Sequence, residues 1–198
     1  MNAISGLVEN QKYEFLIINI DIVSSSKLVD LNESDLNIKE TKSNLIKSLQ
    51  AIVNRYPNIS HESGDGVFFL FSIDNLHKDY DTIASLGIIL IKYIEIFNKN
   101  HIDGNLLSVP ISIRIIGHVG QLIFSNSSGN ISGDELNIVL KNERDIGKKD
   151  HFSISKILYK NINNQDLKRY FIKRDEDLNE KIISILEIPK FNNEMQQK

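Results

Sequence analysis

The chain has 198 residues, of which 41% are hydrophobic and 25% charged, and its formal charge is −3. This length suits one globular domain with a sizeable core, so we expect residues 1–198 to form a single domain. The acidic balance argues against a protein that binds nucleic acid, and the absence of cysteine excludes disulfides, zinc–thiolate sites and thiol catalysis. No apolar run approaches the roughly 20 residues that span a bilayer, and the start lacks a signal-peptide pattern. We therefore expect a cytoplasmic protein with no membrane partner.

The first hundred residues alternate strand and helix patterns. The β-branched apolar run 14–22 predicts a buried strand. Apolar residues at helical spacing predict amphipathic helices over 38–56 and 81–98. Between these helices, segments 59–62 and 67–71 flank an Asp-Gly turn and predict a β-hairpin. This half of the chain therefore has the order strand, helix, hairpin, helix.

The second half continues with a predicted pair of strands, 109–116 and 121–124, joined through residues 117–120. A loop rich in glycine and serine, 125–133, leads into a third predicted helix over about 134–146. Short strands and helices follow. The order β-α-β-β-α-β predicts a ferredoxin-like α+β sandwich, elaborated at its C-terminus.

Two aspartates lie at the ends of apolar strands, Asp21 in INIDIVSSSKL and Asp65 in SGDGVFFLF. A carboxylate in such a place is costly to desolvate unless a positive charge compensates it. For Asp65, ordinary turn chemistry before a glycine is an equally good explanation. The functional interpretation is a pair of oxygen ligands for one or two Mg²⁺ or Mn²⁺ ions that act in phosphoryl transfer.

Four segments in order resemble the motifs of class III nucleotidyl cyclases: FLIINIDIVSSSKL, SGDGVFFLF, IRIIGHVGQLIF and NISGDELNIVLK. They cover about residues 14–162, and the chain after about 189 is a polar tail. The resemblance implies a head-to-tail homodimer with two active sites at its interface. It also implies two divalent cations, Mg²⁺ or Mn²⁺, bound by Asp21, Asp65 and the backbone carbonyl of Ile22.

The predicted third helix carries an apolar stripe beside a polar one. Asn137, Lys141 and Arg144 share the polar stripe, which suits an acidic ligand such as a triphosphate, although a solvated face is the alternative. By the resemblance, Asn137 orients the ribose. Lys141 stands where the family has an arginine that stabilises the transition state, and Arg144 lies close enough in sequence to replace it. Either cation is therefore a candidate for that role.

Two positions that select the base in this family hold His61 and Asn130 here, and they match neither adenylate nor guanylate cyclases. The amide of Asn130 can pair with a pyrimidine edge, whereas His61 alternatively has no role. Small cyclases with such departures resemble the pyrimidine cyclases of Pycsar anti-phage systems, whose product activates a separate effector protein. The leading hypothesis is therefore conversion of UTP to cyclic UMP, with CTP as the next substrate.

Three alternatives compete with a pyrimidine cyclase. A standalone adenylate cyclase is the nearest and differs only in its substrate. A non-catalytic cyclase-homology module is disfavoured by the presence of Asp21 and Asp65 but favoured by Lys141. A GGDEF-type relative would share the paired aspartates and the element order, but the chain lacks the G-G-D-E-F sequence.

Overall fold

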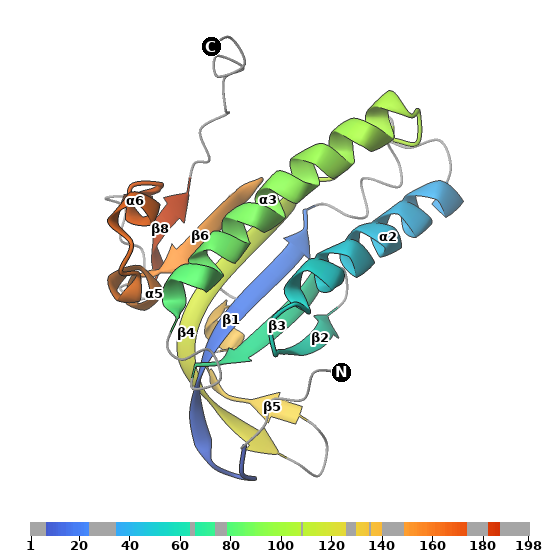
Figure 1. Ribbon diagram of the computed structural model, residues 1–198. Helices are drawn as coiled ribbons and strands as arrows, with labels where there is room; N and C mark the ends of the chain where they lie inside the picture. The colour runs from blue at the N-terminus through green and yellow to red at the C-terminus, as the bar shows by residue number, and fades with distance from the viewer. Residues whose placement is uncertain are drawn as a thin grey trace.

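The computed structural model describes residues 7–23, 35–63, 66–73, 79–107, 109–125, 130–134, 136–139, 149–173 and 182–186. The described strands form one mixed sheet in the order β2-β3-β1-β4-β6-β8-β7, with β5 paired to β4 (Figure 1). The strands are β1 Lys12–Ile22, β2 Ile59–Ser63, β3 Gly66–Ser72, β4 Ile113–Ser125, β5 Asn130–Ser132, β6 His151–Ser155, β7 Phe171–Lys173 and β8 Ile182–Leu186. The helices are α2 Asp35–Val53, α3 Tyr80–Asp103, α5 Lys156–Asn161 and α6 Gln165–Lys168.

The predicted β-α-β-β-α-β order is confirmed, and β1 pairs antiparallel with both β3 and β4, as in a ferredoxin-like sheet. Helix α2 begins and ends three residues before its predicted bounds, and α3 runs five residues past its predicted end. The α3 N-terminus is capped by Asp79, whose carboxylate accepts from the Thr82 N–H at 3.0 Å. None of the helices in the described part of the chain has both the length and the apolarity to cross a membrane.

The prediction of two strands over 109–116 and 121–124 is wrong, because one continuous strand, β4, runs from Ile113 to Ser125. The glycines of this segment indicated a turn. Gly117 instead marks a close approach, since a Cβ there would lie 2.9 Å from the Phe152 ring and 3.0 Å from Leu158. The strand partner of the β4 end is β5, which lies within the predicted loop 125–133.

The two faces of the sheet are covered by different elements. Helices α2 and α3 lie side by side on one face (Figure 1) and bury the large apolar core there. The opposite face carries a smaller apolar cluster that includes Phe15, Ile17 and Val139. Residues 136–139 are helical and pack on this second face, as predicted for the start of the third helix. We call it the open face, because neither long helix covers it.

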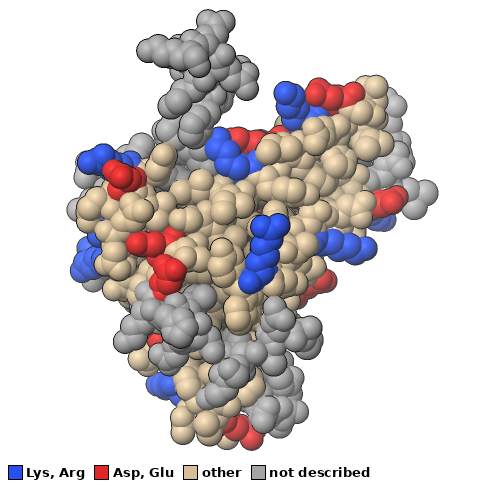
Figure 2. All heavy atoms as spheres, in the orientation of Figure 1, with Lys and Arg blue, Asp and Glu red and all other residues tan. Residues whose placement is uncertain are grey.

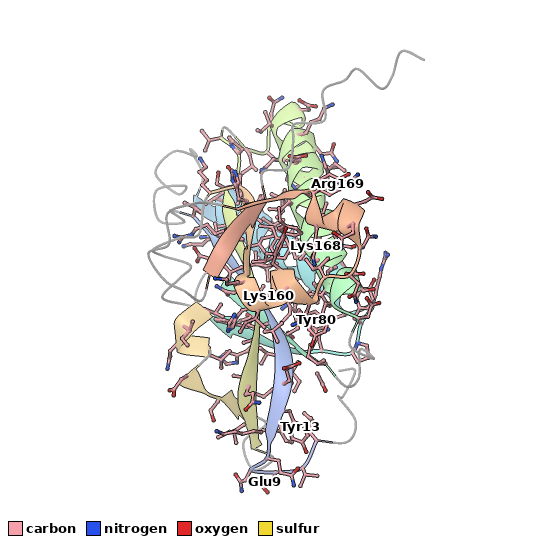
Figure 3. The ribbon with its side chains drawn as sticks, turned by 90° about the vertical axis from the view of Figure 1, so that its left-hand side faces the viewer. Glu9, Tyr13, Tyr80, Lys160, Lys168 and Arg169 are labelled. Carbon is pink, nitrogen blue, oxygen red and sulfur yellow. The ribbon has the colours of Figure 1, made fainter. Side chains whose placement is uncertain are left out.

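The lower ends of β1 and β4 run past the helices as an arm (Figure 3). Tyr13 lies in this arm, and its hydroxyl accepts from the Val8 N–H at 2.7 Å. Above the arm, the Tyr80 hydroxyl at the start of α3 donates to Glu14 of β1 at 2.8 Å. These contacts fix the lower end of β1, whereas the candidate site lies at its upper end.

We predict that Gly87→Ala destabilises the protein, although alanine is normally favoured in a helix by about 1 kcal/mol. A Cβ at Gly87 of α3 would lie 2.1 Å from the buried Phe152 ring, so the ring or the helix must shift, at about 1–3 kcal/mol. Chemical denaturation measures the change. Ser85→Ala in the same helix is the control, and Phe152→Leu should relieve the clash. An unchanged unfolding free energy in Gly87→Ala would contradict this packing.

Candidate functional site

At the upper end of the sheet, four adjacent strands place one residue each in a row across the sheet. Asp21 of β1 is paired with Gly66 of β3 on one side and Arg114 of β4 on the other. Arg114 is paired in turn with His151 of β6. Because residues at the same register lie side by side across a sheet, a carboxylate, a guanidinium and an imidazole are neighbours in this row. The row therefore brings one acidic and two basic side chains together at one end of the sheet.

The central pair of this row is a salt bridge. The Arg114 Nη2 donates to the Asp21 Oδ2 at 2.6 Å, and the two side chains are 21% and 22% exposed. Strand alternation places both on the open face, since Ile20 and Ile22 of β1 face the helices. A charge-assisted hydrogen bond of this length is strong and offsets part of the cost of desolvating both groups. The carboxylate expected from the sequence is therefore present with a cationic partner.

Polar groups continue along the open face below the salt bridge. Asn19 and His118 lie on β1 and β4, and they are 2% and 1% exposed. Both have interactions within the protein, and they are buried polar residues on a face that is otherwise largely apolar. Buried polar residues of this kind hold neighbouring side chains in fixed orientations.

Arg114 and His151 are two residues of this row that were not predicted from the sequence. A signal for Arg114 was present, because it is a charged residue inside the apolar run ISIRIIG, as Asp21 is inside INIDIV. Cross-strand pairing of opposite charges could have been expected between two such residues. No comparable signal marks His151, which follows a turn of ordinary composition. Its imidazole Nδ1 lies 2.6 Å from the carbonyl oxygen of Lys149.

The predicted site residues have different positions in the structure. Asp21 and Ile22 end β1 at the row, while His61 is exposed on β2 opposite Phe68, whose side chain is on the open face. Asn130 begins β5, and Asn137 is exposed on the helical segment whose Val139 is buried. Three predicted residues lie outside the described residues: Asp65, Lys141 and Arg144.

The row matches the requirements of a divalent-cation site only in part. Asp21 supplies a partly exposed carboxylate at a strand end, which is the type of ligand that Mg²⁺ and Mn²⁺ prefer. In the described residues, no three side chains of His, Asp or Glu converge as a metal-binding group. The guanidinium of Arg114 also opposes a second positive charge at this carboxylate. Within the described residues, the fit to a divalent cation is therefore partial, because Asp21 supplies one carboxylate ligand and this carboxylate is paired with Arg114.

Comparisons with known proteins identify the fold. No protein-family model and no curated protein sequence matches the chain. The chain is similar in structure to the adenylyl cyclase CyaB from P. aeruginosa, with a TM-score of 0.70, 19% identity, and coverage of 90% of this chain and 94% of that one. The dimeric guanylyl cyclase domain of the RhoGC fusion protein from the aquatic fungus Blastocladiella emersonii has a TM-score of 0.66 at 17% identity, covering 91% and 97%.

A bacterial light-regulated adenylyl cyclase is similar over 90% of this chain and 52% of that one, with a TM-score of 0.69 and 17% identity. The RhoGC domain is also known in a monomeric form. At these identities the likeness establishes the fold, which is that of the class III adenylyl and guanylyl cyclase catalytic domains. The predicted fold class is confirmed.

We predict that Asp21 and Arg114 stabilise one another. Asp21→Asn and Arg114→Gln should each lower the free energy of unfolding, because each leaves a partly buried charge without its partner. In a double-mutant cycle, the two changes should couple by about 1–3 kcal/mol. Urea denaturation of the four proteins measures this coupling. Strictly additive effects would show that the two side chains do not interact in solution.

Proposed function

We propose that the protein is a class III nucleotidyl cyclase that converts a pyrimidine nucleoside triphosphate, UTP before CTP, to the 3′,5′-cyclic monophosphate. The observation that carries this proposal is the Asp21–Arg114 salt bridge, which lies at the ends of two central strands in a chain with the cyclase fold. A carboxylate and a guanidinium side by side at an exposed strand end can serve the two halves of a metal–polyphosphate complex.

In the proposed reaction, the ribose 3′-oxygen attacks the α-phosphorus and the bond from that phosphorus to the bridging oxygen breaks. Pyrophosphate leaves with the electron pair, and the 3′-hydroxyl proton passes to water. Bound Mg²⁺ or Mn²⁺ would stabilise negative charge on the phosphates and lower the pKa of the 3′-hydroxyl. Asp21, Asp65 and the Ile22 carbonyl would hold these cations. Catalysis then depends mainly on positioning and electrostatics rather than on a side-chain base.

The basic side chains and the side-chain amide of Asn137 have separate proposed roles. Arg114 would exchange its contact with Asp21 for the phosphate oxygens, since its fork of N–H donors matches both anions. Asn137 would orient the ribose, and its exposed position leaves it accessible to a partner subunit. Lys141 or Arg144 would neutralise charge at the α-phosphate in the transition state.

Base selection and biological role complete the proposal. His61 and Asn130 would contact the base across a homodimer interface, and the exposure of His61 is compatible with such a contact. Asn130 supplies the donor and acceptor that a uracil or cytosine edge requires. The cyclic nucleotide would act as a second messenger in anti-phage defence by activating a separate effector protein.

The experiment that tests the function offers each of the four NTPs to the purified dimer with Mn²⁺ and identifies products by mass spectrometry. We expect cyclic UMP as the main product. Asp21→Asn and Asp65→Ala should each lower kcat by at least about 10²-fold, because the cations lose a ligand. The substitution Asp166→Asn at an exposed site on α6 is the control. Cyclic AMP as the preferred product would refute the pyrimidine claim, and no cyclic product from folded dimer would refute the cyclase.

A second prediction concerns Arg114 and separates metal binding from nucleotide binding. Arg114→Gln should tighten Mn²⁺ binding in the absence of nucleotide, because it removes a positive charge 2.6 Å from the Asp21 carboxylate. The same change should weaken triphosphate binding by about 10-fold or more. Titration calorimetry measures both affinities, with exposed Arg55→Gln as the control. Changes of the same sign would contradict the proposed exchange of partners.

A further inference from the structure

His151 is the charged residue of the row to which the proposed reaction assigns no role. It begins β6 and is paired with Arg114 of β4 in a parallel ladder. Phe152 and Ile154 belong to the core under α2 and α3, so strand alternation places His151 on the open face. Because neighbouring strands are about 4.8 Å apart, the His151 backbone lies next to that of Arg114 and about 10 Å from that of Asp21. The imidazole therefore belongs to the side of Arg114 that is away from Asp21.

One ring nitrogen of this imidazole has a fixed partner. Its Nδ1 lies 2.6 Å from the carbonyl oxygen of Lys149. A carbonyl oxygen only accepts hydrogen bonds, so Nδ1 carries a hydrogen and donates it. The other ring nitrogen, Nε2, makes no hydrogen bond to a described residue, and the side chain is half-buried. Nε2 is thus the atom of His151 that is available to a ligand on the open face.

The residue before His151 determines where β6 begins. Asp150 has a φ of 59°, a left-handed conformation that aspartate adopts more readily than most residues. Its N–H donates to the Ile113 carbonyl oxygen at 2.6 Å, and its carboxylate accepts from the Ile113 N–H at 3.2 Å. The same carboxylate accepts from the Ser112 hydroxyl at 3.3 Å. Asp150 therefore joins the start of β6 to the residues just before Arg114, and this contact holds His151 at the register of that arginine.

Arg114 and His151 differ in how they can bind a phosphate. The guanidinium is always charged and offers a fork of N–H donors. A negative charge nearby favours the protonated imidazole, in which both ring nitrogens donate. Side by side on one face, the two groups can thus donate to neighbouring phosphate oxygens. On the helix-covered side, by contrast, basic and acidic side chains are interspersed (Figure 2).

We propose that His151 is a substrate-binding residue whose Nε2 donates to the pyrophosphate part of the nucleotide, beside the phosphate oxygens that Arg114 binds. Asp150 is the positioning residue that holds the imidazole there. The inference deepens the proposed function and rests on it for the identity of the ligand. The leaving pyrophosphate gains negative charge as its bond to the α-phosphorus breaks, so the same hydrogen bond becomes stronger in the transition state.

The test is calorimetric titration of sodium pyrophosphate, with Mg²⁺ present and no nucleotide, into the wild-type, His151→Asn and His151→Gln proteins. The asparagine amide reaches as far as Nδ1 and can keep the contact with Lys149, whereas the glutamine amide reaches as far as Nε2. We expect His151→Asn to bind pyrophosphate about 10-fold more weakly and His151→Gln to recover part of the loss. A histidine that only holds the turn would leave the affinity of His151→Asn unchanged, and this result would overturn the proposal. His101→Asn in α3 is the matched control, because its Nδ1 also lies 2.8 Å from a backbone carbonyl oxygen, that of Phe97, and its affinity should match that of wild type.

A second pair of variants tests the turn that presents the imidazole. Asp150→Gly keeps the left-handed backbone conformation but removes the carboxylate, whereas Asp150→Asn keeps an oxygen acceptor for the Ile113 N–H. We expect Asp150→Gly to weaken pyrophosphate binding by about 3-fold or more and Asp150→Asn to retain most of the affinity. Equal affinities of Asp150→Gly and the wild type would overturn the positioning role of Asp150.

Steady-state turnover separates this inference from the cyclase proposal. His151→Asn should lower kcat/KM for the NTP by about 10-fold, and pyrophosphate should compete with the NTP for the wild-type protein. A purely non-competitive pattern would overturn the assignment to the nucleotide's own phosphates. If no NTP is cyclised but pyrophosphate binding still depends on His151, the cyclase proposal fails and the phosphate contact stands. Unchanged pyrophosphate affinity in His151→Asn, with a loss in Arg114→Gln, overturns the role of His151 whatever the turnover.

Discussion

The salt bridge between Asp21 and Arg114 is the interaction on which the account of this molecule depends. Two charged side chains face each other across β1 and β4 at the end of otherwise apolar strands. A shift of either strand by one residue would turn one charge into the helix-covered core, where it would have no partner. The register that builds the core therefore also fixes the site, and substitution at either residue bears on stability as well as function.

Separation of the two sheet faces makes such a site possible. The face under α2 and α3 contains the large apolar core, including the Phe152 ring that packs closely against Gly87 and Gly117. The open face has a smaller apolar cluster, the buried polar residues Asn19 and His118, and the salt bridge. Because the core is complete on one side, the other side can carry charged groups and accept a ligand or a partner subunit.

The sequence predicted much of the fold because its hydrophobic patterns are long and regular, as in β1, α2 and α3. It failed at β4, where glycine was interpreted as a turn residue although Gly117 is needed for contact with Phe152 on β6, the neighbouring strand of the sheet. The same limit applies to the site. Asp21 was visible from its local context, whereas the pairing with Arg114 depends on the register between strands 93 positions apart in sequence.

The central claim is that the site at these strand ends catalyses the cyclisation of a nucleoside triphosphate. The most direct measurement is a single incubation of the purified protein with Mn²⁺ and all four NTPs at equal concentration, in which cyclic products and pyrophosphate are quantified together. Our account predicts that cyclic UMP dominates, that one pyrophosphate is released for each cyclic nucleotide, and that Asp21→Asn abolishes both. Pyrophosphate release without any cyclic nucleotide, or equal turnover in Asp21→Asn, would contradict it.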